Sequence, residues 1–376
     1  MQPIPFNKPC FLGHELEYIK KAVQNGQISG NGIFTRRCQE LLNQKFQIKK
    51  SLLTNSCTSA LEMAALLVNL KPGDEVIMPS FTFVSTANAF ALRGAKPRFV
   101  DIREDTLNMD ERQIASLISK KTKAICAVHY AGVGCEMDTI MRIAKKKSIE
   151  VIEDAAQAID AKYRGQFLGT IGHLGAFSFH ETKNCISGEG GALLVNKEAY
   201  FERSEIIWEK GTDRCRFFRG EVDKYTWQDI GSSFLPSDLI AAFLCAQLEN
   251  IKIIKSKRKK IFEFYSNHLR CLERRGIQLP HVPSHCETNY HAFYLILPSE
   301  ILRNQLMSQL RKEGILAIFH YVPLHLSRMG KKFGYRKGEF PVSERVSSRL
   351  LRLPFYNDLK ERDLSRIVKA VRRIIG

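Results

Sequence analysis

The chain has 376 residues, 44% of them hydrophobic and 26% charged, which is enough to bury a large core in two domains. It has no apolar run of membrane-spanning length, no signal-peptide pattern and no C-x-x-C pair, so we expect a cytoplasmic protein without a disulfide framework or a metal site. The net charge of +18 is spread along the chain, and its densest run, 252–264, has the apolar spacing of a solvated helix. We therefore expect anionic small-molecule ligands and no nucleic acid partner.

Short apolar runs alternate with helix-like stretches through the first part of the chain. The pattern predicts buried strands at residues 75–79, 97–102, 123–130, 149–156, 175–180 and 191–196. Between them it predicts helices at residues 59–70, 85–94, 110–119 and 137–148. Strands that alternate with helices favour an α/β fold with a mostly parallel sheet covered on both faces. The last two strands are joined by a loop too short for a crossover helix, so we expect them to pair antiparallel.

The pattern changes after about residue 248. A basic helix is followed by apolar stretches at 291–297 and 316–324 and by helices at 302–315 and 361–376. We therefore expect a large α/β domain over residues 1–248 and a smaller α+β domain over residues 249–376.

Three groups of polar residues follow the ends of predicted strands, where open parallel sheets bind their ligands. Asp154 and Gln157 form the first group, Ser178 and Lys183 the second, and the turn Ser-Cys-Thr-Ser at 56–59 opens a helix. Each group also has a simpler explanation. The acid could be a buried carboxylate bonded to turn amides, the lysine could lie on the surface, and the hydroxyls could cap the helix.

Taken together, the three groups point to pyridoxal 5'-phosphate (PLP). PLP needs a lysine for its covalent link and a carboxylate that keeps its ring nitrogen protonated. Its phosphate suits the free N–H groups and the positive end of a helix N-terminus. Because all three requirements are met at neighbouring strand ends, a cofactor site is favoured over three unrelated structural residues.

Four motifs, VIEDAAQA, FSFHETKN…GEGG, MPSFTFVSTANA and FHYVPLH, resemble those of the DegT/DnrJ/EryC1/StrS family of sugar aminotransferases. The resemblance runs from PFNKP near the N-terminus to LRLPFYNDL near the C-terminus. It implies the fold-type I architecture of PLP-dependent aminotransferases, with a large mostly parallel mixed sheet and a smaller C-terminal α+β domain. It also implies a homodimer with active sites shared between subunits.

The resemblance assigns roles to individual residues. Lys183 would hold the cofactor covalently and carry the proton during catalysis, Asp154 would pair with the ring nitrogen, and Gln157 would lie near the ring hydroxyl. Cys57, Thr58 and Ser178 would bind the phosphate of the cofactor. Phe83 would cover one face of the cofactor ring. His320 and Tyr321 would approach the substrate from the small domain.

Two positions depart from the family pattern. Cys57 stands where many relatives have glycine, and it would be strained if the turn required a positive φ. The stretch GSSFL at 231–235 replaces a common G-x-N-x-R motif. Ser233 therefore takes the place of an asparagine that reaches the phosphate in a neighbouring subunit, and Leu235 takes the place of an arginine.

Several loops, including RCRFFRGEVDKYTWQDIGSSFL, resemble one branch of the family. That branch uses L-glutamate to aminate C4 of dTDP-4-keto-6-deoxyglucose in the enterobacterial common antigen pathway. In this loop, Lys224 and Tyr225, with Arg214, Arg216 and Arg219, suit a pyrophosphate and a sugar ring. The alternative is another nucleotide-sugar aminotransferase, acting at C3 or on a UDP- or GDP-linked sugar. A non-catalytic cofactor-binding protein is disfavoured, since it would need neither Lys183 nor Asp154.

Overall fold

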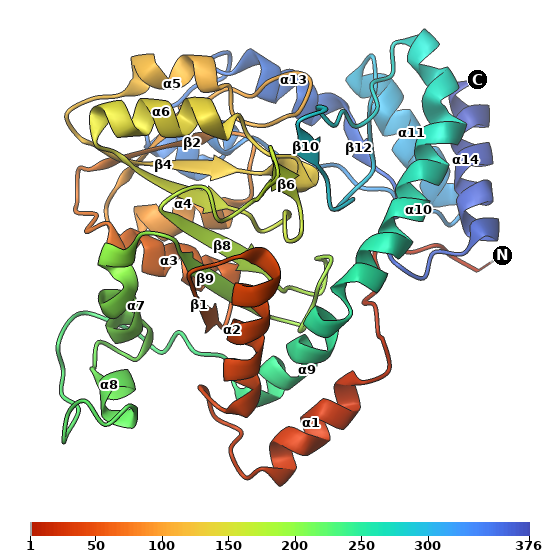
Figure 1. Cartoon of the computed structure of the whole chain (residues 1–376). Helices are drawn as coiled ribbons and strands as arrows, with labels where there is room; N and C mark the ends of the chain where they lie inside the picture. The colour runs from red at the N-terminus through yellow and green to blue at the C-terminus, as the bar shows by residue number, and fades with distance from the viewer. Residues whose placement is uncertain (1) are drawn as a thin grey trace.

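The computed structural model describes residues 2–376, and a seven-stranded sheet forms its centre (Figure 1). Neighbouring strands pair in parallel from β8 to β3, whereas β9 pairs antiparallel with both β1 and β8. The predicted mostly parallel sheet and its antiparallel β8–β9 pair are confirmed. In spatial order the strands are β1 (Lys50–Thr54), β9 (Gly191–Val195), β8 (Leu174–Ser178), β5 (Glu150–Asp154), β4 (Thr122–Val128), β2 (Glu75–Pro79) and β3 (Lys96–Val100).

Helices cover both faces of this sheet. Successive residues of a strand point to opposite faces, so that Leu52 and Leu53 of β1 enter different hydrophobic clusters. The helices of one face are α2 (Ile33–Phe46), α5 (Glu111–Leu117), α6 (Met137–Lys147) and α9 (Asp238–Glu249), and α1 (Glu15–Gln24) packs on α9. Those of the other face are α3 (Cys57–Leu67), α4 (Val84–Ala91) and α7 (Phe201–Trp208).

The C-terminal part has its own hydrophobic cluster, which runs from Ile261 to Val371 and also includes Ile4. A two-stranded antiparallel sheet lies in this part, and only Ile318 of the apolar stretch 316–324 pairs with it, through Arg352. The elements are α10 (Ile251–Leu269), β11 (Tyr294–Ile296), α11 (Glu300–Lys312), α12 (Arg328–Lys332), α13 (Pro341–Arg349), β12 (Leu350–Arg352) and α14 (Glu361–Ile375).

Short elements complete the fold. A small antiparallel sheet joins β6 (Lys162–Tyr163), β7 (Gln166–Phe167) and β10 (Cys286–Glu287), and α8 (Arg214–Phe218) lies in a loop after α7. Single 3₁₀ turns form η1 (Tyr130–Gly132), η2 (Glu198–Tyr200) and η4 (Leu324–Leu326), and a longer one forms η3 (Arg270–Arg275). No helix within residues 2–376 has both the length and the apolar character needed to cross a bilayer.

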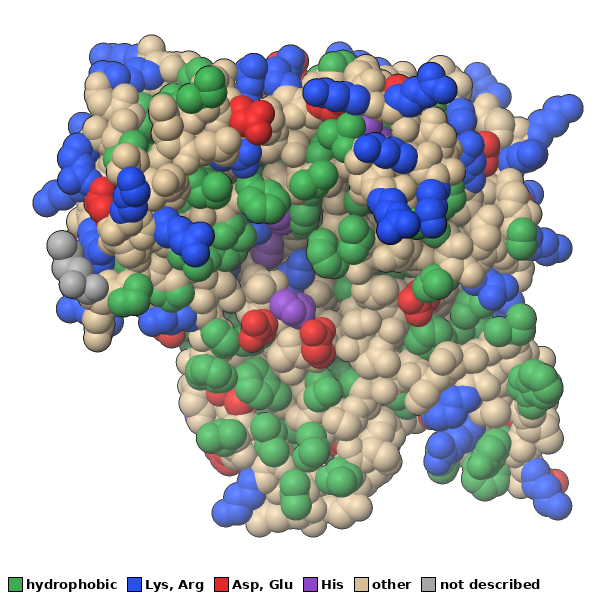
Figure 2. All heavy atoms as spheres, turned by 180° about the vertical axis from the view of Figure 1, so that it is seen from behind, with side chains coloured by type: hydrophobic (Ala, Val, Ile, Leu, Met, Phe, Trp, Pro, Cys, Tyr) green, Lys and Arg blue, Asp and Glu red, His purple; other side chains and the backbone are tan. Residues whose placement is uncertain are grey.

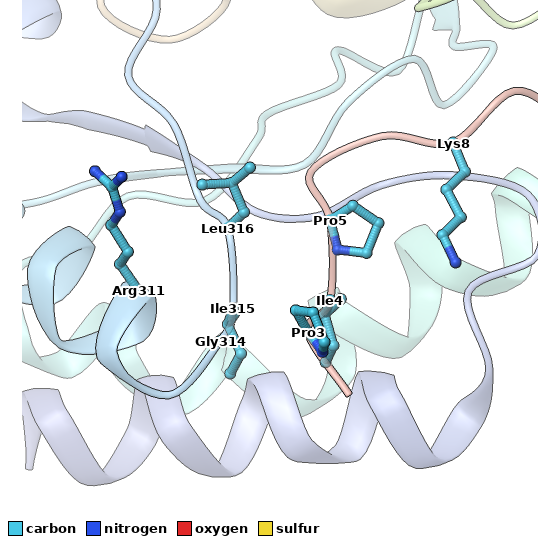
Figure 3. A pocket seen from close by; sticks show the side chains of 8 residues that line it. All are labelled: Pro3, Ile4, Pro5, Lys8, Arg311, Gly314, Ile315 and Leu316. Carbon is cyan, nitrogen blue, oxygen red and sulfur yellow. The ribbon is translucent and has the colours of Figure 1, made fainter. Parts of the chain in front are cut away.

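The N-terminal segment packs on the C-terminal part rather than on the sheet. Figure 3 shows Pro3, Ile4 and Pro5 beside the turn that follows α11. The amide of Ile4 donates to the carbonyl of Gly314 at 2.7 Å, and the amide of Leu316 donates to the carbonyl of Ile4 at 3.0 Å. A division into domains at residues 248 and 249 would fall at the last residue of α9, just before α10, and it stays a prediction.

The direction of the strands decides where a site can form. Because β9 is antiparallel to both of its neighbours, β1 runs in the same direction as β8 and as the parallel strands beyond it. Six strands therefore end at one edge of the sheet, among them β1 at Thr54, β5 at Asp154 and β8 at Ser178. This edge is where ligands of open parallel sheets bind.

Candidate active site

A cavity of about 620 Å³ opens at the carboxyl edge of the sheet. Figure 2 shows a hollow on one face of the molecule with histidine and basic side chains inside it and hydrophobic side chains around it. The cavity brings together nine of the predicted site residues: Cys57, Thr58, Phe83, Asp154, Gln157, Ser178, Lys183, His320 and Tyr321.

Three predicted site residues do not line this cavity. Ser233 is exposed, and its carbonyl accepts a 3.4 Å hydrogen bond from the side chain of Asn55. Lys224 and Tyr225 are exposed in the loop after α8. Their predicted contacts therefore cannot be made to the cavity of the same chain.

Two arginines in and directly after α8 are engaged by acids of their own chain. Arg216 bonds to Glu221 at 3.3 Å, and Arg219 bonds to Glu205 at 2.9 Å and to Glu221 at 2.6 Å. Their expected role in pyrophosphate binding is weakened, because the guanidinium groups already have carboxylate partners.

Lys183 lies in the loop between β8 and β9, and its side chain enters the cavity half-buried. The backbone amide of Lys183 donates to the carbonyl of His180 at 2.9 Å, which closes a turn directly after β8. Within the described residues, its ammonium nitrogen has neither a hydrogen bond nor an ion pair. Burial lowers the pKa of the Lys183 amine, because the charged form loses its hydration.

Asp154 ends β5 and is buried. Its Oδ2 atom accepts a hydrogen bond from the hydroxyl of Thr86 at 2.7 Å, and its Oδ1 atom accepts one from the amide of Ala156 at 3.2 Å. The Thr86 hydroxyl lies 2.9 Å from that of Thr82, so α4 holds the carboxylate in a fixed orientation. No cation pairs with this carboxylate in the described part of the chain. A buried carboxylate of this kind is suited to a cationic ring nitrogen.

The start of α3 forms another part of the cavity wall. Ser56 is the N-cap residue, and its hydroxyl accepts a hydrogen bond from the amide of Ser59 at 3.1 Å. Cys57 is the first helical residue and has no positive φ, so the strain that would follow from a left-handed turn is absent. The hydroxyl of Thr58 donates to that of Ser85 at 2.8 Å. These hydroxyls, together with free helix amides, make an anion cradle.

These residues fit PLP on three counts. The cradle can take the phosphate, the Asp154 carboxylate can take the ring nitrogen, and the Lys183 amine is free to react. The cradle also depends on a close approach of β9, because a Cβ added at Gly191 would collide with the backbone of Ser56 and Cys57. Gly191 is the last residue of the Gly-Glu-Gly-Gly run in the sequence.

A bridge of side chains connects the large sheet to the C-terminal part across the cavity. The side chain of Gln157 accepts a hydrogen bond from the amide of Ala131 at 2.8 Å and donates one to the Tyr321 hydroxyl at 2.9 Å. The rings of Phe83 and Tyr321 lie 6.1 Å apart. Phe83 itself is 56% exposed, so it stands at the mouth of the cavity.

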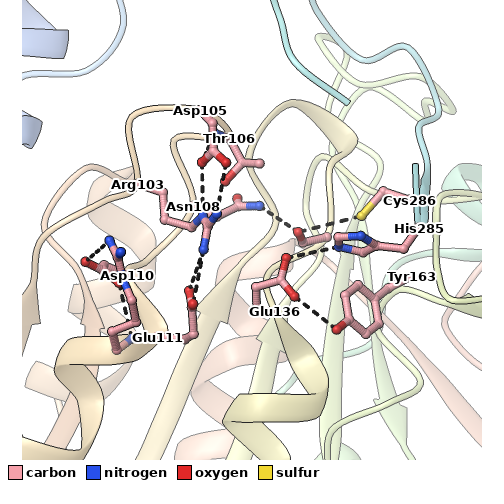
Figure 4. Close-up of polar contacts among 12 residues, drawn as sticks. Arg103, Asp105, Thr106, Asn108, Asp110, Glu111, Glu136, Tyr163, His285 and Cys286 are labelled. Atoms are coloured by element: carbon pink, nitrogen blue, oxygen red, sulfur yellow. Dashed lines mark hydrogen bonds and ion pairs between the residues drawn. The ribbon is translucent and has the colours of Figure 1, made fainter. Parts of the chain in front are cut away.

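A polar network that includes Asn108 holds the turn that carries Ala131, and Figure 4 shows Asn108 beside Arg103 and Asp105. Asn108 accepts a hydrogen bond from the amide of Tyr130 at 2.8 Å and donates to the carbonyls of Val133 at 3.0 Å and Gly134 at 2.9 Å. The loop that bears Asn108 is itself tied down by Arg103, which pairs with Asp105 at 2.9 Å. The turn thereby places the hydroxyl of Tyr130 within 3.0 Å of a ring nitrogen of His320.

Sequence reasoning missed other residues of the cavity wall, chiefly Phe6, Thr86, His129, His180, His291 and Arg352. Thr86 could have been found, since it lies in the quoted motif MPSFTFVSTANA and one helical turn after Thr82. Arg352 lies in the quoted stretch LRLPFYNDL, but nothing in the local pattern separates it from the many other arginines.

A model of the DegT/DnrJ/EryC1/StrS aminotransferase family matches residues 10–372. This protein belongs to that family. Among curated relatives, it is 34% identical over 380 residues to the uncharacterized protein MJ1066 of Methanocaldococcus jannaschii, with 99% of this chain and 98% of the relative covered. It is 29% identical over 380 residues to the spore coat polysaccharide biosynthesis protein SpsC of Bacillus subtilis, with 99% and 97% covered.

Solved structures of sugar aminotransferases support the same family assignment. The PLP form of the putative sugar aminotransferase Spr1654 from Streptococcus pneumoniae matches with a TM-score of 0.91 and 26% identity, over 99% of this chain and 98% of that one. Its PMP form matches with the same TM-score and identity, over 99% of each chain. The predicted fold-type I architecture, the class of PLP-dependent sugar aminotransferases and the PLP cofactor are therefore confirmed.

Proposed function

We propose that this family member is a dTDP-4-amino-4,6-dideoxygalactose transaminase. It would transfer the amino group of L-glutamate to C4 of dTDP-4-keto-6-deoxyglucose and release 2-oxoglutarate. The observation that carries amino transfer is the unpaired amine of Lys183, which shares one cavity with the Asp154 carboxylate and the start of α3. PLP, when bound, supplies the electron sink for this chemistry.

The residues of this chain would divide the work in the following way. The amine of Lys183 takes a proton from the donor carbon and returns one to the sugar carbon, and its lowered pKa suits it to accept the proton. The Asp154 carboxylate, oriented by Thr86, stabilises the positive ring nitrogen. Tyr321, held by Gln157, excludes water from the same space.

The dTDP-sugar is proposed from the loop of residues 214–235, whose sequence resembles the branch that acts on this substrate. Lys224 and Tyr225 would contact the sugar nucleotide in the cavity of a partner subunit, and Ser233 would approach the phosphate of the cofactor there. Lys224 suits an anion, because within the described residues it has no acidic partner.

A homodimer is part of this proposal. Large hydrophobic side chains are exposed in two regions, the segment of residues 11–33 and the segment of residues 217–230, which is unusual for a monomer. They are Phe11, Leu16, Val23, Ile28 and Ile33 in the first region and Phe217, Phe218, Tyr225, Trp227 and Ile230 in the second. We also keep the cytoplasmic location and a role in enterobacterial common antigen biosynthesis as predictions.

The test is a panel of nucleotide sugars with L-glutamate as donor and NMR identification of the product. We expect conversion of dTDP-4-keto-6-deoxyglucose to a sugar with an axial 4-amine. A product with the gluco configuration, or conversion only of a 3-keto, UDP-linked or GDP-linked sugar, would favour the alternative of another nucleotide-sugar aminotransferase.

A further inference from the structure

Most of the net charge of the chain lies in its C-terminal part. Residues 251–376 contain 26 lysines and arginines and 10 acids, so their net charge is +16, out of +18 for the whole chain. The first 250 residues, which contribute most of the active-site cavity, are nearly neutral, with 31 basic and 29 acidic side chains. A local excess of positive charge favours binding to an anionic surface such as a membrane or a nucleic acid.

A groove of about 650 Å³ in the C-terminal part lies between α11, α13 and the loop of residues 319–326. It shares no lining residue with the active-site cavity. Within the loop, Phe319 and Val322 line the groove, whereas His320 and Tyr321 between them line the cavity. The groove is therefore a separate feature, on the other side of this segment from the candidate active site.

The groove contains a buried guanidinium that is poorly neutralised. Arg303 is 8% exposed, and its Nε atom has no hydrogen-bond partner within residues 2–376. Its ion pair with the exposed Glu300 spans 3.8 Å. Glu344, the other acid of the groove, is already bonded to the ring of His325 at 3.0 Å. A buried cation with so little compensation favours an anion in the groove.

Other cations lie in the groove and in α12, which begins two residues after the lining residue Leu326. They are exposed or half-buried, and none has an acidic partner in the described part of the chain: Arg328, Lys331, Lys332, Lys337 and Arg349. They add to the positive charge of Arg303 on one side of the C-terminal part.

Large hydrophobic side chains are exposed among these cations. Phe319 and Val322 of the groove are 52% and 57% exposed, Ile301 beside Glu300 is 71% exposed, and Met329 of α12 is 50% exposed. At a lipid surface such side chains leave water while neighbouring cations meet headgroup phosphates. A nucleic acid would satisfy the cations and leave the aliphatic side chains in water.

We propose that the groove and α12 together form a docking face for an anionic phospholipid membrane. Arg303 and the free cations would pair with headgroup phosphates, and the four exposed hydrophobic side chains would enter the boundary between headgroups and acyl chains. The docking face includes neither the cavity nor the segments 11–33 and 217–230 of the proposed dimer. The inference therefore goes beyond the proposed function and does not depend on which sugar is aminated.

Sedimentation of the holoenzyme with lipid vesicles tests the role of charge. Vesicles with about one-third phosphatidylglycerol should bind it at least about 30-fold more tightly than pure phosphatidylcholine vesicles, since each cation near an anionic surface contributes about fivefold. Added salt should release the protein. The variant Lys331→Gln/Lys332→Gln/Lys337→Gln should bind the anionic vesicles at least about 30-fold more weakly.

The matched control removes the same charge from another surface. Lys145→Gln/Lys146→Gln/Lys147→Gln replaces three exposed lysines of α6 and should change vesicle binding less than about 3-fold. Equal losses in the two triple variants would overturn the proposal, because they would reflect net charge alone. So would equal binding of wild type to both kinds of vesicle, or binding to neither.

A second variant tests the hydrophobic side chains. Ile301→Ser/Met329→Ser should weaken vesicle binding at least about 5-fold. It should leave the salt concentration for elution from heparin unchanged, because heparin offers charge without hydrocarbon. Leu92→Ser, at a 70% exposed position outside the docking face, should change neither. If the double variant binds vesicles as wild type does, the face serves a soluble polyanion such as a nucleic acid or an acidic protein, and the proposal is wrong.

Discussion

Lys183 and Asp154 differ in the number of hydrogen-bond partners that surround their charged groups. The Asp154 carboxylate is held by two donors, Thr86 and the amide of Ala156, whereas the Lys183 amine has no polar partner in the described residues. An ammonium group in such a place is poorly solvated, which lowers its pKa and favours the reactive neutral amine. The two residues therefore suit different roles: a fixed electrostatic partner and a mobile proton carrier.

Lys183→Ala should abolish turnover while PLP still binds non-covalently. The variant loses both the covalent link and the proton carrier, so we expect a loss of more than about a thousandfold in rate. Borohydride reduction followed by mass spectrometry should attach the cofactor to the peptide of Lys183 in wild type and to no peptide in the variant. Residual activity of more than a few per cent, or labelling of another lysine, would contradict the assignment.

Asp154→Asn should slow reaction with L-glutamate and weaken cofactor binding, because the neutral amide no longer stabilises a protonated ring nitrogen. Thr86→Val is the matched control for the network: it removes one hydrogen bond to the carboxylate and should have a clearly smaller effect. Stopped-flow absorbance of the bound cofactor measures both variants. An Asn variant with the wild-type rate for this half-reaction would rule out the pairing.

Buried histidines make stability depend on pH. Burial lowers the pKa of His320 and His291 well below 6.5, so the native state binds fewer protons than the unfolded state in acid. Stability should therefore fall as the pH drops below about 6.5, by up to about 1.4 kcal/mol per pH unit for each such group. His320→Gln should reduce this slope, measured as the urea midpoint between about pH 8 and about pH 5. The exposed His281→Gln should not, and an unchanged slope in His320→Gln would contradict the expected role of burial.

At the scale of secondary-structure elements, the ends of helices and strands form the walls of the candidate active site. Helix α3 begins at the cavity because β1 ends at Thr54 and Ser56 caps the next turn. On the opposite face, α2 begins where Asp238 of α9 accepts hydrogen bonds from the amides of Phe34 at 3.2 Å and Thr35 at 2.8 Å. This contact joins segments about two hundred residues apart, since it connects positions 35 and 238.

Asp238→Ala should destabilise the protein by about 2–3 kcal/mol, because it leaves buried donors of α2 without an acceptor. The hydroxyl of Thr35 also loses a 2.8 Å bond to this carboxylate. Denaturant unfolding measures the loss. Ser327→Ala is the control: it removes the cap of the short helix α12 and should cost about 1 kcal/mol or less. Equal losses of unfolding free energy in the two variants would show that the Asp238 contact stabilises the protein no more than an ordinary helix cap does.

At the scale of the whole molecule, three of the predicted site residues do not line the cavity of their own chain, as the proposed shared site would require. Its walls come from the large sheet and from the C-terminal part, yet Lys224, Tyr225 and Ser233 lie outside it on an exposed loop. The same loop carries Trp227, which is 81% exposed. A large exposed indole of this kind commonly marks an interface.

Mixing two inactive variants should restore activity if active sites are shared. Lys183→Ala lacks the amine, and the double variant Lys224→Ala/Tyr225→Ala lacks the loop contacts. In a mixed dimer, one cavity would receive Lys183 from one chain and an intact loop from the other. We expect partial recovery of activity after co-refolding, with each variant alone as control. Activity that equals the sum of the separate variants, or a monomer in light scattering, would contradict the shared site.

The sequence by itself determined the α/β class, the antiparallel β8–β9 pair and most element positions, since these follow from local periodicity and loop length. Helix α3, for example, was expected at 59–70 and lies at 57–67. Motifs at strand ends also identified Lys183 and Asp154 as candidates, because parallel strands must end at one edge. Only the tertiary structure brought Arg352 next to His320 and Phe6 and left Lys224 outside the cavity. Such contacts depend on how segments that are distant in the chain pack together. The types of the residues and their spacing in the sequence do not determine that packing.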